Sequence, residues 1–221
     1  MGLGYQLRQY FIRVSTTMSA ARFFFILTFV LMTGCAMNDL PRLQSIERSV
    51  DLQRFMGDWY VIGSIPIDNW FASEANAHNA VENYVLTDDG KIQTTYTFRK
   101  DGFDGEEKQF NPVAWVHNTN TNAEWRMQFL WPFRSAYLIA YLDEDYQHTI
   151  IGVPNRTYVW IMSRAPDIGE DDYERLVNVV SELGYDSSLV QRIPQQWSCL
   201  LYTSDAADDT PCVDLGGRRI I

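Results

Sequence analysis

The 221-residue sequence has few side chains of the kinds that metal sites and common enzymes require. Its three histidines, His78, His117 and His148, are scattered, and neither a His-x-x-x-His nor a Cys-x-x-Cys pair occurs. No serine lies in a Gly-x-Ser-x-Gly elbow, and no glycine-rich phosphate loop follows a predicted strand. The sequence therefore predicts no metal site and no bound cofactor.

Positive charge is also scarce. Lysine and arginine number 18 against 28 aspartates and glutamates, which gives a formal net charge of -10. A nucleic-acid-binding protein would show a basic stripe, so we expect no nucleic-acid partner. The length and the 46% hydrophobic content fit one globular domain with additional segments.

Only three cysteines are present, and none is expected to form a disulfide in the core. Cys199 and Cys212 fall in residues 198–221, a segment rich in Asp and Gly without helical or alternating periodicity. This segment resembles translated sequencing-adapter read-through fused to a truncated gene, and a natural disordered tail is the alternative. We expect a disordered tail that takes no part in the fold.

The longest apolar run near the N-terminus, residues 23–32, is too short to span a bilayer as a stable helix. It follows Arg22 and leads into Thr-Gly-Cys ending at Cys35, which resembles a bacterial lipobox. The resemblance implies a signal peptide over residues 1–34, cleavage before Cys35 and lipidation of that cysteine; a plain secretory signal is the alternative. Ala36 then favours the outer membrane, and Met18 is an alternative start.

Residues 35–50 are predicted to form the lipidated cysteine and a polar tether, and residues 51–197 a single domain. Short strand-like segments recur in that domain at intervals of about ten residues, which is typical of an all-β sandwich or barrel. The expected strands are 58–66, 79–87, 91–99, 108–117, 124–130, 136–142, 146–153 and 157–164. Eight such strands joined by short turns can close into an up-and-down barrel wide enough for one small ligand.

One amphipathic helix is expected after the eighth strand. Tyr173, Leu176, Val177, Val180 and Leu183 share one helical stripe, which must pack on the outside of the sheet. A capping box over residues 167–170, a glycine at position 184 after the helix end and a short strand near 189–193 complete the prediction.

Three motifs in this order resemble the lipocalin family. Gly57 and Trp59 open the first strand, Asp143 and Tyr146 lie between strands six and seven, and Arg164 ends strand eight. The finer resemblance is to bacterial outer-membrane lipocalins of the apolipoprotein-D-like kind. It implies an all-β, eight-stranded antiparallel up-and-down β-barrel with one C-terminal α-helix packed outside. It also implies that Arg164 packs across Trp59 at the closed end through a cation–π contact.

Alternation of side chains along the strands predicts which residues face the lumen. Counting back from Arg164 by twos, and following the apolar faces of the other strands, gives an aromatic interior with a few polar groups, typical of a small-molecule site. Tyr141 is placed on the same face. The predicted ligand-binding residues are Glu82, Tyr84, Ile92, Thr94, Tyr96, Phe98, Trp125, Met127, Phe129, Tyr137, Ile139, Tyr158, Trp160 and Met162.

The resulting prediction is a non-enzymatic binding protein, lipid-anchored on the periplasmic side of the outer membrane, that binds, stores or transports fatty acids or lysophospholipids for envelope maintenance. Two alternatives stay open. An enzyme on this fold, such as an isomerase or a de-epoxidase, would depend on Glu82, His148 or the lumen tyrosines. A solid barrel would be an envelope scaffold without ligand. The oligomeric state is open, with a homodimer as one option.

Overall fold

The computed structural model describes residues 40–68 and 73–197. The chain divides into two units, Met1–Pro41 and Arg42–Ile221, and the elements described below belong to the second. The predicted signal peptide, Cys35 and the predicted tail over residues 198–221 lie outside the described residues and stay predictions. Within the part of the chain that the structure describes, no helix is both long and apolar enough to cross a membrane.

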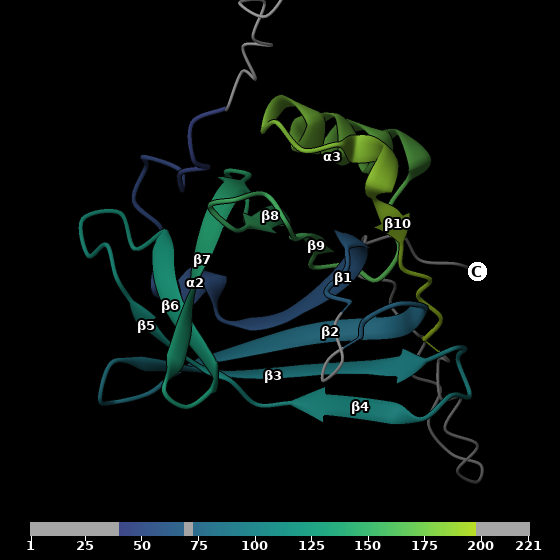
Figure 1. Cartoon of the computed structure of the whole chain (residues 1–221), viewed down its shortest axis with the longest axis horizontal. Helices are drawn as coiled ribbons and strands as arrows, with labels where there is room; N and C mark the ends of the chain where they lie inside the picture. The colour runs from purple at the N-terminus through teal and green to yellow at the C-terminus, as the bar shows by residue number, and fades with distance from the viewer. Residues whose placement is uncertain (1–39, 69–72, 198–221) are drawn as a thin grey trace, which may run out of the picture. The chain divides into compact units, whose positions relative to one another are not determined.

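One antiparallel sheet closes on itself to form a barrel (Figure 1). Its strands are β1 (Gly57–Ile65), β2 (Ala77–Leu86), β3 (Lys91–Lys100), β4 (Glu107–Phe110), β5 (Val113–Val116), β6 (Glu124–Leu130), β7 (Phe133–Leu142), β8 (His148–Gly152), β9 (Val159–Ser163) and β10 (Gln191–Arg192). Pairing of β1 with β9 closes the ring, and β10 adds to β1 beside it. Because β4 and β5 both pair with β3, they act as two halves of one strand. The predicted eight-stranded up-and-down barrel is confirmed.

Two local departures from the prediction have clear causes. The strand expected over residues 108–117 is interrupted at Asn111 and Pro112, because proline has no N–H to donate to a strand ladder. A short helix, α2 (Leu52–Phe55), precedes β1 and was not predicted. Asp51 caps it by accepting hydrogen bonds from the backbone N–H groups of Gln53 and Arg54.

The predicted amphipathic helix is α3 (Glu170–Glu182), followed by the 3-10 helix η1 (Ser187–Leu189). Leu176 and Val180 are fully buried against the outer face of the barrel, as the stripe predicted. The capping box is wrong, because the N-cap is Gly169 and makes no side-chain hydrogen bond. Gly184 follows the helix end at φ +84°, as predicted.

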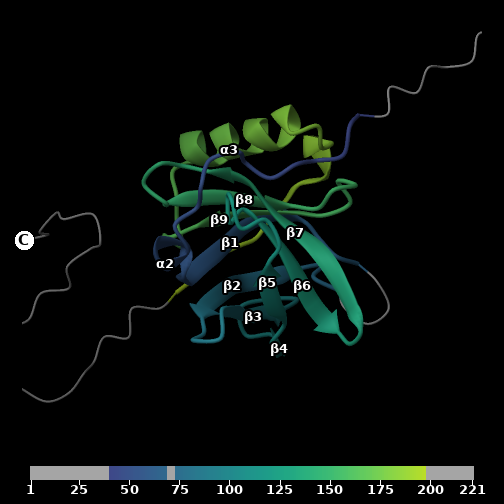
Figure 2. The same cartoon turned by 90° about the vertical axis from the view of Figure 1, so that its left-hand side faces the viewer.

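The barrel has two different ends (Figure 2). At the α2 end lie the start of β1 and the turns around residues 88–90, 117–123 and 143–147. At the opposite end, which we call the rim, lie the end of β1 and the β3–β4, β6–β7 and β8–β9 connections. Residues 43–50, predicted as part of a polar tether, pack on the barrel, since Leu43 N–H donates to Pro154 O at the rim and Val50 N–H to Thr121 O at the α2 end. These residues of the predicted tether therefore belong to the same unit as the barrel.

Candidate functional site

The α2 end is filled by Trp59. This side chain is fully buried, and its indole N–H donates to the Phe55 carbonyl over 2.9 Å. The guanidinium carbon of Arg164 lies 3.8 Å from the centroid of the Trp59 ring, so the expected contact between the two side chains is present. Trp59 thereby forms the floor of the lumen.

Arg164 also ties α2 to the barrel through main-chain oxygens. Its Nη1 donates to Asp58 O over 2.6 Å, and its Nη2 lies 2.8–3.0 Å from the carbonyl oxygens of residues 54, 55 and 56. Burial lowers the pKa of Arg164 to about 10, which leaves it charged at neutral pH. Gly57 has φ +91°, and a Cβ there would meet Arg164 Nη1 at 3.5 Å. The backbone turn beneath the guanidinium thus accounts for the glycine.

Asp143 and Tyr146 shape the turn between β7 and β8 at the same end. The Asp143 carboxylate accepts hydrogen bonds from the backbone N–H of Gln147 at 2.7 Å and of His148 at 3.0 Å, and it contacts His148 Nδ1 at 2.9 Å. The Tyr146 hydroxyl accepts from Asp51 N–H at 2.9 Å, next to α2. His148 is thus bound to this turn and shares the outward parity of Ile150, so it is not a lumen acid–base candidate.

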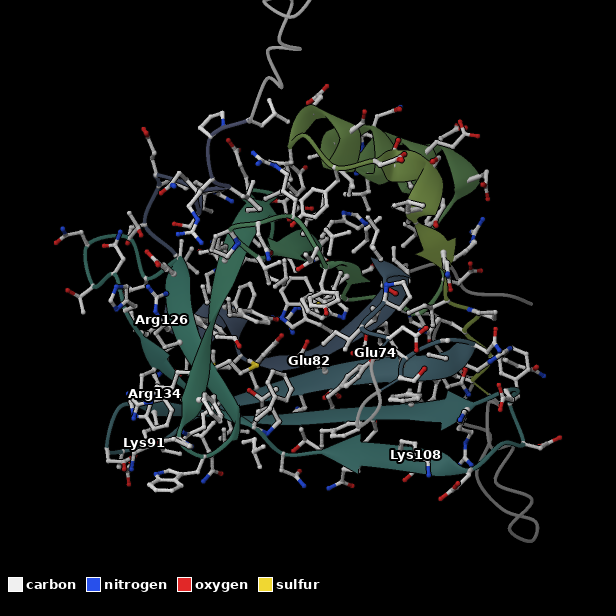
Figure 3. All side chains as sticks on the ribbon, in the orientation of Figure 1. Glu74, Glu82, Lys91, Lys108, Arg126 and Arg134 are labelled. Atoms are coloured by element: carbon white, nitrogen blue, oxygen red, sulfur yellow. The ribbon has the colours of Figure 1, made fainter. Side chains whose placement is uncertain are left out.

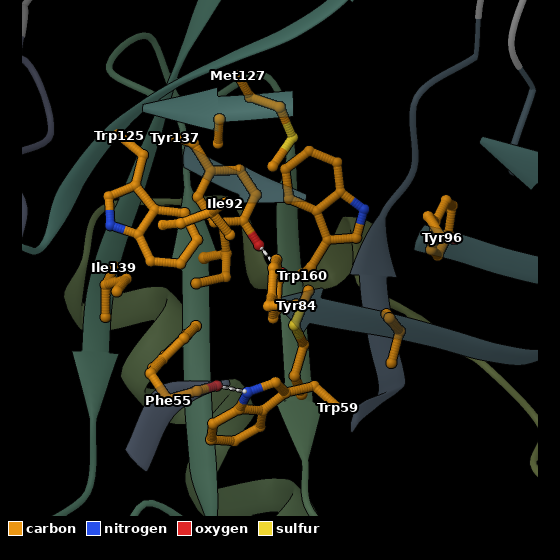
Figure 4. Packing of buried hydrophobic residues seen from close by; sticks show 14 of the residues in the cluster. Phe55, Trp59, Tyr84, Ile92, Tyr96, Trp125, Met127, Tyr137, Ile139 and Trp160 are labelled. Carbon is orange, nitrogen blue, oxygen red and sulfur yellow. Dashed lines mark hydrogen bonds between the residues drawn. The ribbon is translucent and has the colours of Figure 1, made fainter. Parts of the chain in front are cut away.

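The predicted lumen residues come together inside the barrel (Figure 3, where Glu82 lies inside while Arg126 and Arg134 lie at one side). Almost all of them are buried in one cluster or against it (Figure 4). The buried members are Glu82, Tyr84, Ile92, Thr94, Tyr96, Phe98, Trp125, Met127, Tyr137, Ile139, Trp160 and Met162, with Tyr158 partly buried against them. Their common location is observed, and their role in binding stays a proposal.

Two residues predicted to face the lumen lie outside it. Phe129 is 51% exposed, because the β6–β7 register shifts between Met127 and Leu130 and ends the alternation. The β7–β8 register shifts likewise between Ile139 and Tyr141. The Tyr141 ring packs on the outer cluster, and its hydroxyl accepts from Arg175 on α3 at 3.3 Å. The prediction for Tyr141 is wrong because the bulge reverses its face, and Phe129 lies outside the buried cluster because the regular β6–β7 pairing ends before it.

Aromatic rings form the lumen wall above Trp59. Tyr137 stacks with Trp125 at a centroid distance of 5.5 Å and with Trp160 at 6.4 Å. Phe55 packs edge-on against Trp125 at 5.4 Å and connects this stack to the floor. These contacts leave the lumen side chains little freedom to reorient, so the interior is a preorganised apolar surface.

The polar centre of the lumen is Glu82 with two tyrosines. The Tyr137 hydroxyl donates to Glu82 Oε2 at 3.3 Å, and the hydroxyls of Tyr84 and Tyr137 are hydrogen-bonded to each other. Burial raises the pKa of Glu82 to about 8, although its hydrogen bonds to the tyrosines oppose the shift. At neutral pH Glu82 is therefore mostly protonated and has a proton to donate.

A second buried carboxyl, Glu74, was missed by the sequence reasoning. Its Oε2 accepts from the Trp160 indole N–H and from the Ile67 backbone N–H, each at 3.2 Å. Burial raises its pKa to about 7. Glu74 also lines a cleft of about 170 Å³ shared with β10. It lies in the connection between β1 and β2, where no strand alternation indicates its direction.

Two buried hydroxyls have no hydrogen-bond partner among the described residues: Thr94 Oγ1 and the Tyr96 hydroxyl. Both belong to β3 and point into the lumen. Besides burial, the charges of Glu74 and Glu82 raise the pKa of Tyr96, which places its hydroxyl within electrostatic reach of both carboxyls. No group of three or more His, Cys, Asp and Glu side chains suited to a metal ion occurs in the described residues.

Comparison with known proteins identifies relatives of the whole barrel. Residues 50–195 match the family model of the lipocalin-like domain. The chain is 32% identical over 164 residues to temperature-induced lipocalin-1 of Arabidopsis thaliana, covering 68% of this chain and 82% of that protein. It is 28% identical over 161 residues to the outer membrane lipoprotein Blc of Escherichia coli K12, covering 72% and 86%.

Solved structures show the same fold at lower identity. Insecticyanin from the tobacco hornworm Manduca sexta superposes with a TM-score of 0.54 at 17% identity, covering 72% of this chain and 86% of that one. Apocrustacyanin C2 superposes with a TM-score of 0.53 at 12% identity, covering 71% and 89%. These similarities concern the arrangement of the strands.

Proposed function

The chain belongs to the lipocalin-like family, and from that premise we propose that its barrel reversibly binds a lipophilic small molecule, a fatty acid or a lysophospholipid. The aromatic lumen supports this proposal, because each buried methylene of an acyl chain gains roughly 0.8 kcal/mol. A chain of a dozen or more carbons would exceed the cost of association on burial alone.

The observation that carries the proposal is the pair of unpartnered hydroxyls on Thr94 and Tyr96. A buried polar group without a partner costs about 1–3 kcal/mol, so buried hydroxyls are normally paired. Here they lie inside the barrel, and Tyr96 and Thr94 pair across β2–β3 with Glu82 and Tyr84, respectively. A ligand with a hydrogen-bonding group would satisfy them, and its acyl chain would lie against the aromatic wall.

The ionisation of Glu82 would select the head group. Below its pKa of about 8 the protonated carboxyl donates a hydrogen bond, which a free fatty-acid carboxylate accepts. Above that pH two carboxylates would repel each other in a site of low dielectric. The choline head group of a lysophospholipid carries a positive charge and would avoid this repulsion. Oleate binding should therefore weaken from pH 6.5 to pH 9, and lysophosphatidylcholine binding should weaken less.

The cellular setting proposed for the protein is the outer membrane, with the barrel held on the periplasmic side by a lipid on Cys35. Support comes from the lipobox-like sequence and from relatives named outer membrane lipoproteins, in Escherichia coli and in Vibrio cholerae. In this setting the barrel would store or carry acyl lipids for envelope maintenance.

Mass spectrometry of lipids extracted from the gently purified chain, with titration of tryptophan fluorescence by oleate and lysophosphatidylcholine, tests the proposal. A co-purified lipid, or saturable quenching near one ligand per chain, is expected because Trp125 and Trp160 line the lumen. Tyr96→Phe should weaken binding about five- to tenfold, the effect of one lost hydrogen bond, and should stabilise the ligand-free protein.

Tyr60→Phe is the matched control, because Tyr60 packs on the outer cluster beneath α3. It should leave ligand affinity unchanged. A folded protein that yields no lipid and shows no saturable quenching would overturn the proposal, and the barrel would then be a solid envelope scaffold.

A further inference from the structure

The connection between β6 and β7 exposes a compact apolar surface. Phe129 is 51% exposed, Leu130 66%, Trp131 81% and Phe133 72%. We call residues 129–133 the hairpin tip; Leu130 and Phe133 pair with each other, and residues 131 and 132 form the turn. Single exposed apolar residues are ordinary, but four large ones within five consecutive residues at the end of one hairpin mark an interaction surface.

The hairpin tip lies at the rim (Figure 2). Figure 2 shows α2 at one side of the barrel and the end of the β6–β7 hairpin at the other. The strand order agrees, because β7 starts at the tip and ends beside the turn at residues 143–147, next to α2. The apolar surface therefore lies at the end of the barrel opposite the Trp59 floor.

The N-terminal segment reaches the barrel at the same end. The backbone N–H of Leu43 donates to Pro154 O in the β8–β9 connection at 3.0 Å. Cys35 precedes Leu43 by eight residues, and eight extended residues span at most about 28 Å. If Cys35 carries the proposed lipid, the rim is held within that distance of the bilayer surface. The α2 end lies a barrel length farther along the packed segment 43–50.

The charge within the hairpin itself also suits a lipid surface. Residues 129–135 contain no acidic residue, although the whole chain has a net charge of -10. Arg134 follows the tip, and its guanidinium lies 4.0 Å from the ring centroid of Trp115. None of the ion pairs among the described residues involves Arg134. An apolar tip beside a cation without a counter-ion matches the boundary between acyl chains and phosphate groups.

We propose that the hairpin tip inserts into the surface of the lipid bilayer, with Trp131 and Phe133 as the inserted side chains. Tryptophan and phenylalanine at the end of a rigid turn bury apolar area in the interface at low entropic cost. The inserted tip and the eight-residue separation of Cys35 from Leu43 together turn the rim toward the membrane. The inference goes beyond ligand binding, and its tether argument alone rests on the proposed lipidation of Cys35.

The test uses the full chain in phosphatidylcholine–phosphatidylglycerol vesicles, with and without bromine on the acyl chains. The emission difference between the unmutated chain and Trp131→Phe isolates the Trp131 signal, and this exposed, conservative change should not disturb folding. We expect that signal to be at least about twofold lower in brominated vesicles, because interfacial tryptophan lies at the depth of the upper acyl chain.

Trp197→Phe provides the matched control, since Trp197 is 47% exposed but packs edge-on against Tyr60 on the barrel wall. Its difference signal should be the same in both kinds of vesicle. Equal Trp131 signals in both kinds, from protein that floats with the vesicles, overturn the proposal, as does protein that does not float at all. A Trp131 signal that responds to protein concentration but not to vesicles identifies a second copy as the partner and also overturns it. Intact mass reports acylation of Cys35 separately, and ligand titration reports the lumen.

Discussion

Glu82→Gln should remove much of the pH dependence of folding stability. The carboxyl is buried in the lumen with a pKa raised from 4.5 to about 8. A group whose pKa is higher in the folded than in the unfolded state stabilises the fold most below its unfolded pKa. That contribution is lost as the pH rises to the folded pKa, because the unfolded chain releases the proton first.

The magnitude follows from the two pKa values. Each pKa unit corresponds to about 1.4 kcal/mol, so Glu82 should lower the free energy of unfolding by roughly 2–3 kcal/mol between pH 5 and pH 7 and by roughly 4 kcal/mol between pH 5 and pH 9. Glutamine has nearly the same shape and no titrating proton, so the variant should lack this slope. The remaining slope should include Glu74, whose raised pKa of about 7 acts in the same direction.

Urea unfolding at several pH values measures the effect. The midpoint and the slope m give the free energy of unfolding at each pH for the unmutated chain, Glu82→Gln and the control Glu182→Gln, which alters an exposed residue of α3. The decisive quantity is the difference in pH slope, because any lost hydrogen bond to Tyr137 shifts all values equally. If Glu82→Gln and the unmutated chain show parallel curves, Glu82 is ionised in the folded state and the reasoning on the lumen is refuted.

Three further substitutions test the packing around the barrel. Arg164→Lys should destabilise the fold by roughly 2–4 kcal/mol in urea unfolding, because an ammonium group can neither reach the carbonyl oxygens of residues 54, 55, 56 and 58 together nor cover the Trp59 ring. An unchanged urea midpoint would contradict this. Gly152→Ala should lower the free energy of unfolding by roughly 1–3 kcal/mol, since a Cβ would lie 2.5 Å from the Tyr185 hydroxyl. Thermal melting should show a lower Tm; an unchanged Tm would mean that the Tyr185 side chain moves aside without cost. Asp143→Asn should lower the free energy of unfolding by about 1–3 kcal/mol, because an amide nitrogen would replace one of the carboxylate oxygens that accept from the backbone N–H groups of Gln147 and His148. A melting curve identical to that of the unmutated chain would show that Asp143 does not stabilise the β7–β8 turn.

The α2 end was the most predictable part of the molecule. Gly57 and Trp59 lie more than a hundred residues before Arg164, yet the resemblance of their motifs to a known family predicted the contact between Trp59 and Arg164 that the structure shows. Strand alternation also predicted most of the lumen, because one face of a closed barrel must be apolar throughout. Family motifs therefore predicted the contact at the α2 end, and strand alternation predicted which side chains face the lumen.

Features that depend on one inserted residue could not be predicted in this way. The register shifts that expose Phe129 and turn Tyr141 outward leave no mark in the hydrophobic pattern, since an aromatic residue suits either face. Glu74 lies in an irregular connection, and only the folded chain shows that it meets Trp160. The break at Pro112 is the exception, because a proline inside a predicted strand already argues against continuous pairing.

The hydrogen bonds of Arg164 have a consequence for sequence variation. Its partners at positions 54, 55, 56 and 58 are all main-chain oxygens, so the side chains there contribute nothing to these bonds. Arg54, Met56 and Asp58 should therefore tolerate exchange in a mutational scan as far as this contact is concerned. What must be kept is the path of the backbone, which Gly57 permits, and the contact between the Arg164 and Trp59 side chains. Much of the sequence of residues 54–58 can thus change during evolution while the α2 end of the barrel stays closed in the same way.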